Sequence, residues 1–284
     1  MALTTTELLT DIKLLGNIPD TTDTSSVNYD ANILSVASRI LILRLVPAIL
    51  SIQEDYYTTT SETTIVAGQA RYRLPSRAIS GSLRDVRIRR GTEERSLAMV
   101  PQERRRDSSA GEVIGFYLEG DEVVLYQTPS KGGDTLILSY FRSPNRLALV
   151  SDCDTVSVIH DDYIETTGAL SGDLTKDFIR AEAPHSFVAT ATTVDFGAAS
   201  TGATPPTSLS VGDYVAPVGT SPVVQAPDIA WYILSGFTTA AVLRALGSAD
   251  YAAHEDAAKA DLANWLQTLT PRVQGELPPI LPPM

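Results

Sequence analysis

The segment from Ala31 to Ile52 restricts the fold of this chain more than any other, because apolar side chains cover most of its circumference when it is drawn as a helix. One face carries Ile33, Val36, Ile40 and Leu43, another carries Leu34, Leu41, Leu45 and Ile49, and the charged residues are Arg39 and Arg44. A helix that is apolar on most sides has to be buried on most sides. We therefore expect it at the centre of the domain or at a subunit interface, with a kink or an end near Pro47.

The pattern around this helix predicts an α+β protein. Thr4 and Glu7 form a capping-box signature that starts a first helix, and Pro227-Asp228 starts a helical region that ends before Pro271. The region between consists of short β-type runs separated by turn residues, including the hairpin signal Glu119-Gly120-Asp121. We predict a helical bundle from residues 1–57 and 225–270, an inserted antiparallel β-rich domain over 58–224, and an extended, proline-stiffened arm over 271–284.

Composition narrows the possible functions. The chain has 284 residues and a formal net charge of −12, which argues against general nucleic-acid binding. A single cysteine, Cys153, excludes an internal disulfide. The N-terminus carries no signal-peptide pattern. The apolar run from Ile40 to Ile52 has 13 residues and an internal proline, so we expect no membrane span and no membrane partner.

The basic residues are distributed unevenly. Eleven of the 22 fall between Arg71 and Arg106, all of them arginine, against four carboxylates in the same window. The window therefore carries +7 and the rest of the chain −19. The arginine fork suits carboxylates and phosphates, although a solvated sheet face would give the same pattern. We favour an interface with carboxylates of a neighbouring protein, formed by Arg77, Arg84, Arg87, Arg89, Arg90, Arg104, Arg105 and Arg106.

Residues that could support catalysis are scattered along the sequence. His160 beside Asp161-Asp162 is the best metal candidate, but a surface turn explains it more simply. Cys153 has no histidine near it in the sequence, and the chain has neither a phosphate-binding loop nor a nucleophile elbow. We expect no catalytic residues, metal or cofactor. A carboxylate pair needs no fixed spacing, so an unrecognised enzyme stays an alternative.

The junction between the first helical region and the β region carries a more specific pattern. Asp55-Tyr56-Tyr57-Thr58 is followed by Gly68-Gln69, Tyr72-Arg73-Leu74-Pro75, Arg77-Ala78-Ile79-Ser80-Gly81 and Leu83-Arg84-Asp85-Val86. This run resembles the head-to-tail adaptor, or connector, proteins of tailed bacteriophages. The close resemblance covers roughly residues 55–90. The region from Ser151 to Val224 matches no part of the family pattern.

The resemblance implies a structural virion protein of the phage neck or tail, assembled in the host cytoplasm. Such proteins form a ring, typically of twelve copies, between the portal and the tail or nozzle proteins, and double-stranded DNA passes through without sequence-specific binding. The C-terminal arm resembles the tails that bind the portal, which here would use Leu277, Pro278, Ile280, Leu281 and Pro282. A virion-surface, receptor-binding attachment protein is the main alternative.

Overall fold

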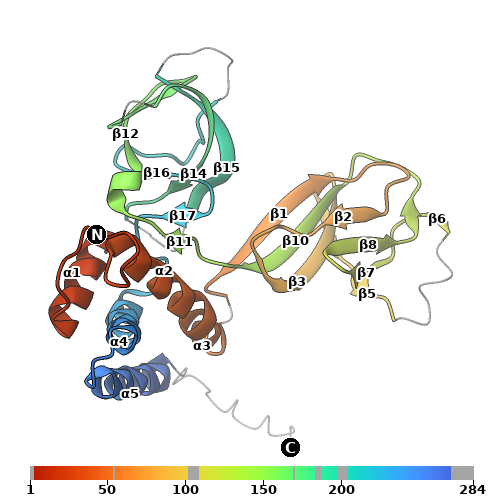
Figure 1. Ribbon diagram of the computed structural model, residues 1–284. Coiled ribbons are helices and arrows are strands. Elements are labelled where there is room, and N and C mark those ends of the chain that lie inside the picture. The colour runs from red at the N-terminus through yellow and green to blue at the C-terminus, as the bar shows by residue number, and fades with distance from the viewer. Residues whose placement is uncertain are drawn as a thin grey trace, which may run out of the picture. The chain divides into compact units, whose positions relative to one another are not determined.

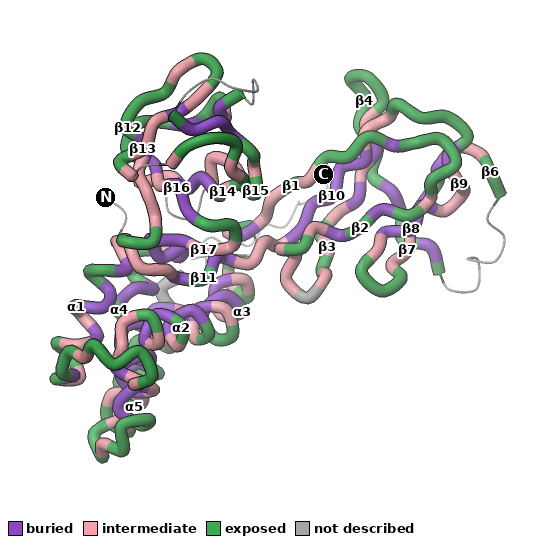
Figure 2. Tube along the Cα trace, turned by 45° about the horizontal axis from the view of Figure 1, so that its top comes forward, coloured by how far each residue is buried: buried purple, intermediate pink, exposed green. Residues whose placement is uncertain are grey.

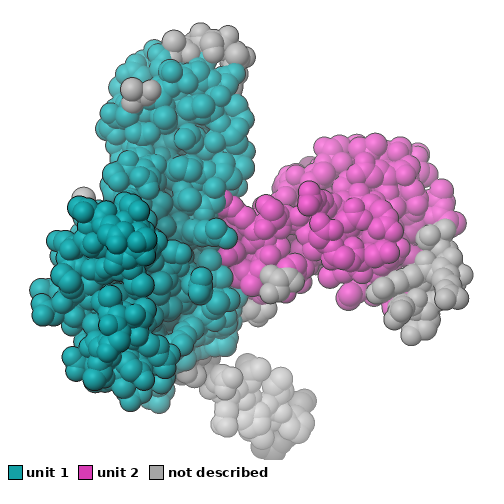
Figure 3. All heavy atoms as spheres, in the orientation of Figure 1, with its two compact units in different colours: residues 1–53, 144–284 teal, residues 54–143 magenta. Residues whose placement is uncertain are grey.

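The computed structural model describes residues 3–53, 55–101, 109–168, 170–182, 187–197 and 204–269. The chain divides into two compact units, shown in teal and magenta in Figure 3. Unit 1 is Met1–Gln53 together with Pro144–Met284, and unit 2 is Glu54–Ser143. The chain is 29% helix and 35% strand, which agrees with the mixed class expected from the sequence. The predicted C-terminal arm, 271–284, lies outside the described residues.

The helices of unit 1 come from both ends of the chain (Figure 1). They are α1 (Thr5–Gly16), α2 (Asp30–Ile40), α3 (Val46–Leu50), α4 (Asp228–Ala245) and α5 (Tyr251–Leu269). The predicted capping box is confirmed, because the Thr4 N–H donates to Glu7 Oε2 at 2.7 Å and the Glu7 N–H donates to Thr4 Oγ1 at 3.4 Å. At its other end α1 stops at Asn17, which adopts the left-handed conformation.

The apolar segment folds as one helical stretch, Asp30–Leu50, with a π-helical turn between α2 and α3. The π turn covers Leu41–Leu45 and lies just before Pro47, whose ring would clash with the carbonyl four residues earlier in a regular helix. Wide turns of this kind relieve that clash. Burial is heaviest on one side: Ile33, Leu34, Leu41, Leu45 and Ile49 are buried, whereas Leu43 is 67% exposed.

Asp30–Leu50 is the one helix among the described residues whose length and composition would allow it to cross a membrane. The apolar run from Ile40 to Ile52, from which we expected no membrane span, is therefore shorter than this 21-residue helix. Buried helices of water-soluble folds meet the same criterion, and α2 packs against α4 through its buried face.

Helix α4 is the element on which the other helices pack. The Trp231 indole N–H donates to Asp11 Oδ2 of α1 at 2.6 Å. Gly236 lets α5 approach closely, since a Cβ built there would lie 3.2 Å from the Cβ of Ala258. Buried residues lie all round α4, as expected for a helix with neighbours on several sides. The N- and C-terminal helices thus pack together, while their classification as a bundle stays a prediction.

Unit 2 is built from two four-stranded sheets that share one core. The first has the order β1 (Thr58–Thr64), β10 (Thr135–Arg142), β3 (Ala78–Arg90) and β4 (Glu93–Ser96). The second has the order β2 (Arg71–Arg73), β8 (Glu122–Tyr126), β7 (Gly115–Glu119) and β5 (Ala98–Met99). Two short strands, β6 (Ala110–Gly111) and β9 (Thr128–Pro129), pair beside them. Buried residues run along β10 and β8, purple in Figure 2, and the predicted 119–121 hairpin joins β7 to β8.

Unit 1 also contains a closed five-stranded barrel. Its strands follow the order β12 (Asp154–Ile159), β13 (Ile164–Thr166), β15 (Phe187–Phe196), β14 (Gly172–Ile179) and β16 (Tyr214–Ala216). Val156, Ile164, Phe178, Phe196 and Val215 are buried in its interior. A further strand pair, β11 (Arg146–Leu147) with β17 (Thr220–Ser221), and a 3-10 turn, Val150–Asp152, belong to the same unit. The segment 58–224, predicted as one β domain, therefore contributes to two units that separate after Ser143.

A buried carboxylate, Asp177 on β14, ties the strands of the barrel to the segments that flank it. Its Oδ1 accepts a hydrogen bond from the Ala191 N–H at 2.8 Å. Its Oδ2 accepts from Asn145 Nδ2 and from the Gly219 N–H, both at 2.9 Å. Ala191 has a φ of 48°, beside a break in the β14–β15 register. Asp177 therefore holds a bulged strand in a conformation that costs energy for a residue with a Cβ.

We predict that Asp177→Ala destabilises the fold by roughly 3 kcal/mol, because it removes a fully buried acceptor from the buried Asn145 amide and from two partly buried backbone hydrogen bonds. Denaturant unfolding followed by circular dichroism measures the change. Asp161→Ala, which removes an exposed carboxylate from the same barrel, is the matched control and should change stability little. Equal stability of the two variants would contradict the role assigned to Asp177.

Candidate protein-interaction surface

The arginines predicted as an interface lie mainly on β3. Arg84, Arg87, Arg89 and Arg90 belong to this strand, and Arg77 comes directly before it. Arg104, Arg105 and Arg106 lie outside the described residues. Along β3 the side chains alternate: Val86 and Ile88 are buried in the core, while Arg87 and Arg89 belong to the opposite face of the sheet.

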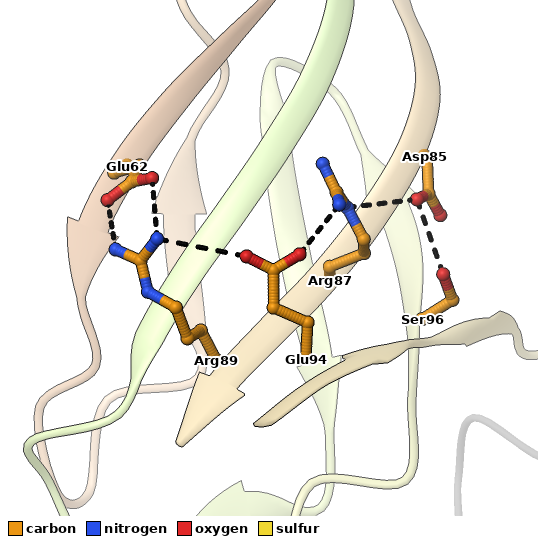
Figure 4. Close-up of polar contacts among 6 residues, drawn as sticks. All are labelled: Glu62, Asp85, Arg87, Arg89, Glu94 and Ser96. Carbon is orange, nitrogen blue, oxygen red and sulfur yellow. Dashed lines mark hydrogen bonds and ion pairs between the residues drawn. The ribbon is translucent and has the colours of Figure 1, made fainter. Parts of the chain in front are cut away.

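This opposite face carries alternating charges across three strands, which we call the charge ladder: Glu62 of β1, Asp85, Arg87 and Arg89 of β3, and Glu94 of β4 (Figure 4). Arg89 Nη1 donates to Glu62 Oε1 at 3.0 Å and lies 3.8 Å from Glu94 Oε1. Arg87 Nη1 donates to Glu94 Oε2 at 2.7 Å, and its Nε lies 3.2 Å from Asp85 Oδ2. Each carboxylate of the ladder therefore has an arginine partner within the chain.

Two pairs of the ladder, Arg89–Glu62 and Arg87–Glu94, run diagonally across the sheet. In the strand register Arg87 lies opposite Ile137 and Ser96, and Arg89 opposite Thr135 and Glu94. Glu62 shares the register position of Arg87, and Glu94 that of Arg89. The bonds from Arg89 to Glu62 and from Arg87 to Glu94 are therefore each displaced by two residues along the strands. Diagonal neighbours are within reach of long side chains. Ile137 is buried although it belongs to this face, as expected where arginine stems cover apolar surface.

The other described arginines of unit 2 have partners as well. Arg84 pairs with Asp55, and Arg90 pairs with Asp134 at 3.0 Å and Glu112 at 3.4 Å. On the second sheet, Arg71 binds Glu119 and Glu122 at 2.7 and 2.8 Å. Glu54–Ser143 contains thirteen Lys and Arg and thirteen Asp and Glu, so unit 2 has no formal net charge. The whole −12 of the chain belongs to unit 1.

The pairing has a direct effect on ionisation. The hydrogen bond that Arg89 donates to Glu62 is the main cause that raises the pKa of Arg89, and the hydrogen bond that Arg90 donates to Asp134 does the same for Arg90. Both arginines therefore stay charged at neutral pH. Because these side chains are partly exposed, the pairs are open to salt screening and each contributes modestly to stability.

These contacts change what the arginine cluster can do. The window from Arg71 to Arg106 looks strongly basic because its counter-charges come from other parts of the sequence, Asp55, Glu62 and residues 112–134. Once folded, Arg84, Arg87, Arg89 and Arg90 already bind carboxylates of their own unit. A partner would meet a fixed pattern of alternating charge on this face. As a subunit interface the cluster stays a prediction.

The junction motif forms part of the framework of unit 2. Tyr57, Tyr72 and Leu74 are buried, and the Tyr72 hydroxyl accepts a hydrogen bond from the Val66 N–H at 2.9 Å. Gly68 and Gly81 have positive φ values of 80° and 66°, which favour glycine. The aromatic and glycine positions of the motif are therefore explained by packing and turn geometry within the sandwich.

The candidate metal ligand His160 and the candidate nucleophile Cys153 can be judged from their surroundings in the described part of the chain. No group of three or more His, Cys, Asp or Glu residues there could hold a metal ion. His160 stacks on Tyr163, with ring centroids 4.0 Å apart, and its Nε2 lies 3.2 Å from Glu165 Oε1. Burial raises the pKa of Cys153 to about 12, with smaller contributions from Asp152 and Asp154. A thiol in that environment stays protonated and is a poor nucleophile.

We predict that Arg89→Glu lowers the melting temperature more than Arg73→Glu, because it places a third acid between Glu62 and Glu94, whereas Arg73 is mostly exposed and pairs with Asp121 at 3.3 Å. Combining Glu62→Arg with Arg89→Glu should recover part of the loss. Thermal unfolding at low and high salt measures both effects. A double variant no more stable than Arg89→Glu would show that the two side chains are not coupled.

We also predict slow labelling of Cys153 by a thiol reagent at pH 8. A pKa near 12 in place of 9.0 reduces the thiolate fraction by about a thousandfold relative to the unfolded chain. Because the folded-state pKa is raised, the protonated thiol supports folding below pH 9, and that support is lost as the pH rises from 9 toward 12. Ser151→Cys in a Cys153→Ser background is the exposed control. Equal labelling rates would contradict this assignment.

Comparison with known proteins shows the family of the chain, which the charge pattern alone does not show. A family model described as SU10 adaptor protein matches residues 4–191, well over half of the chain. The match spans α1, the apolar helix, all of unit 2 and most of the barrel strands. It therefore corrects the expectation that the region from Ser151 onward has no counterpart in the family, because residues 151–191 lie within the match. No curated protein matches the chain significantly. The chain belongs to the SU10 adaptor protein family, a family of structural, non-enzymatic head-to-tail adaptors of bacteriophages.

Proposed function

We propose that copies of this chain form a closed ring between the portal and the tail of the virion, twelve copies by the resemblance of its junction motif to connector proteins. The observation that carries the proposal is the adaptor-family match over residues 4–191. The helices of the two chain ends, acting as a bundle, would form the body of each subunit. Tail or nozzle proteins would bind the ring on the side away from the portal, and assembly would take place in the host cytoplasm.

The charge distribution supports a passive role toward DNA. Unit 1 carries the whole net charge of −12, and unit 2 has no formal net charge. Tight nonspecific DNA binding needs cations that are free to replace the counterions of phosphates. A surface with few free cations lets a duplex slide past. We propose that double-stranded DNA passes through the ring during packaging retention and ejection without sequence-specific contacts.

Two segments are proposed to bind protein partners. The first is the arm over 271–284, where Leu277, Ile280 and Leu281 would enter apolar sites on the portal and the prolines would keep the chain extended. The second is the arginine cluster, in which Arg104, Arg105 and Arg106 are the members closest to one another in sequence. Both would act as docking surfaces and not as catalytic sites.

Mixing the purified chain with portal rings of its own phage tests the proposal. We expect the two to co-sediment and to form a two-tiered ring in negative-stain images. Deleting Glu276–Met284 should weaken binding at least tenfold while leaving the melting temperature unchanged, because the deleted residues follow the last helix of the core. A full-length chain that does not bind the portal would contradict the function, and a large loss of melting temperature would assign the arm to the core.

A further inference from the structure

A cavity of about 440 Å³ lies in unit 2 where the first sheet meets the short strands β6 and β9. Ile65, Ile88 and Val113 line it and belong to the apolar core of the sandwich. Polar residues surround this floor, among them Ser130, Glu112 and Asp134. A cavity with an apolar floor and a few polar groups is the usual form of a binding site. It has no part in the charge ladder or the proposed arm.

The rim of the cavity has an excess of positive charge. Arg90, Arg95 and Lys131 are set against two carboxylates, Glu112 and Asp134. Arg90 binds both acids, and Arg95 lies 3.8 Å from Glu112. Lys131 is exposed and forms no ion pair with any residue that the structure describes. The rim therefore suits a ligand that combines an apolar surface with a carboxylate.

The hairpin between β12 and β13 has the complementary chemistry. Asp161 and Asp162, at the middle of its connecting turn, are exposed, and neither pairs with a cation in the described part of the chain. The strand that leads to them exposes Val158 by 40% and Ile159 by 36%. Two adjacent carboxylates on an apolar stem match the excess cation and the apolar floor of the cavity.

The hairpin is also held in one conformation. The His160 N–H donates to the Tyr163 carbonyl at 2.9 Å, and the two rings stack nearly parallel, 15° apart. His160 Nε2 lies 3.2 Å from Glu165 Oε1 on the return strand. A loop fixed in this way loses little conformational freedom on binding, which favours its use as a docking element.

We propose that the β12–β13 hairpin of one copy docks into the unit 2 cavity of a second copy, with its aspartates at Lys131 and Arg95 and Ile159 over the apolar floor. The two surfaces differ, so every copy offers one of each and the contact passes from copy to copy in one direction. The inference rests on the proposed function only in requiring that copies associate. It adds the pair of surfaces that makes the contact.

Cross-linking between two single-cysteine variants tests the contact. Lys131→Cys and Asp162→Cys, each with Cys153→Ser, are prepared separately, mixed and treated with a short bismaleimide. We expect a product of twice the 30.5 kDa chain mass in the mixture and much less with either variant alone. Asp121→Cys, in the β7–β8 turn of the same unit, replaces Lys131→Cys as the matched control. A mixture that yields no more product than this control overturns the proposal.

Charge reversal gives an independent readout by light scattering. Lys131→Glu and Asp162→Lys should each weaken self-association about tenfold, and the two together should restore it. Failure of the double variant to recover association, or a wild-type chain that stays monomeric at every concentration, also overturns the contact. Portal binding by the full-length chain is measured separately, so either result can exclude this contact while the adaptor function stands.

Discussion

The register between β10 and β3 is the constraint on which unit 2 depends. Leu136 lies opposite Ile88 and Leu138 opposite Val86, and this pairing places four apolar side chains in the core. Because side chains alternate along a strand, a slip of one residue would turn Arg87 and Arg89 inward. The free energy needed to bury an unpaired arginine is far larger than the stabilisation that a surface ion pair contributes. The charge ladder and the apolar core therefore enforce the same register from opposite faces of one sheet.

In unit 1 a buried carboxylate, Asp177, helps to hold the strands of the barrel in place. The barrel has short strands, and β13 meets β15 through a single parallel bridge, so the backbone ladder alone leaves gaps. Asp177 fills such a gap by accepting hydrogen bonds from segments far apart in the sequence, at Asn145, Ala191 and Gly219. Networks of this kind stabilise a fold only when every member is satisfied. Unit 2 is thus supported by ion pairs on the outer face of a sheet, whereas the barrel of unit 1 is supported by the buried carboxylate of Asp177.

Sequence reasoning predicted the features that depend on local chemistry. The capping box at Thr4, the turn at Gly120 and the helical ends follow from residue type and period, and the structure contains them. The barrel could not be predicted because β14 does not alternate: it buries three consecutive residues, Asp177, Phe178 and Ile179, and one of them is an acid. The charge pairs were missed for a different reason. Glu62 and Arg89 are 27 residues apart, and only the strand order brings them together.

The two ends of unit 2 meet within the unit itself. The Arg142 N–H donates to the Tyr57 carbonyl at 2.8 Å, and the Ser143 N–H donates to the Arg77 carbonyl at the same distance. Segments whose ends are adjacent and whose core is self-contained are tolerated as insertions in other proteins. This segment also adds no formal net charge to the chain, since its thirteen basic and thirteen acidic residues cancel. Residues 54–143 therefore combine adjacent ends, a core of their own and a net charge of zero, which are the properties expected of an inserted domain.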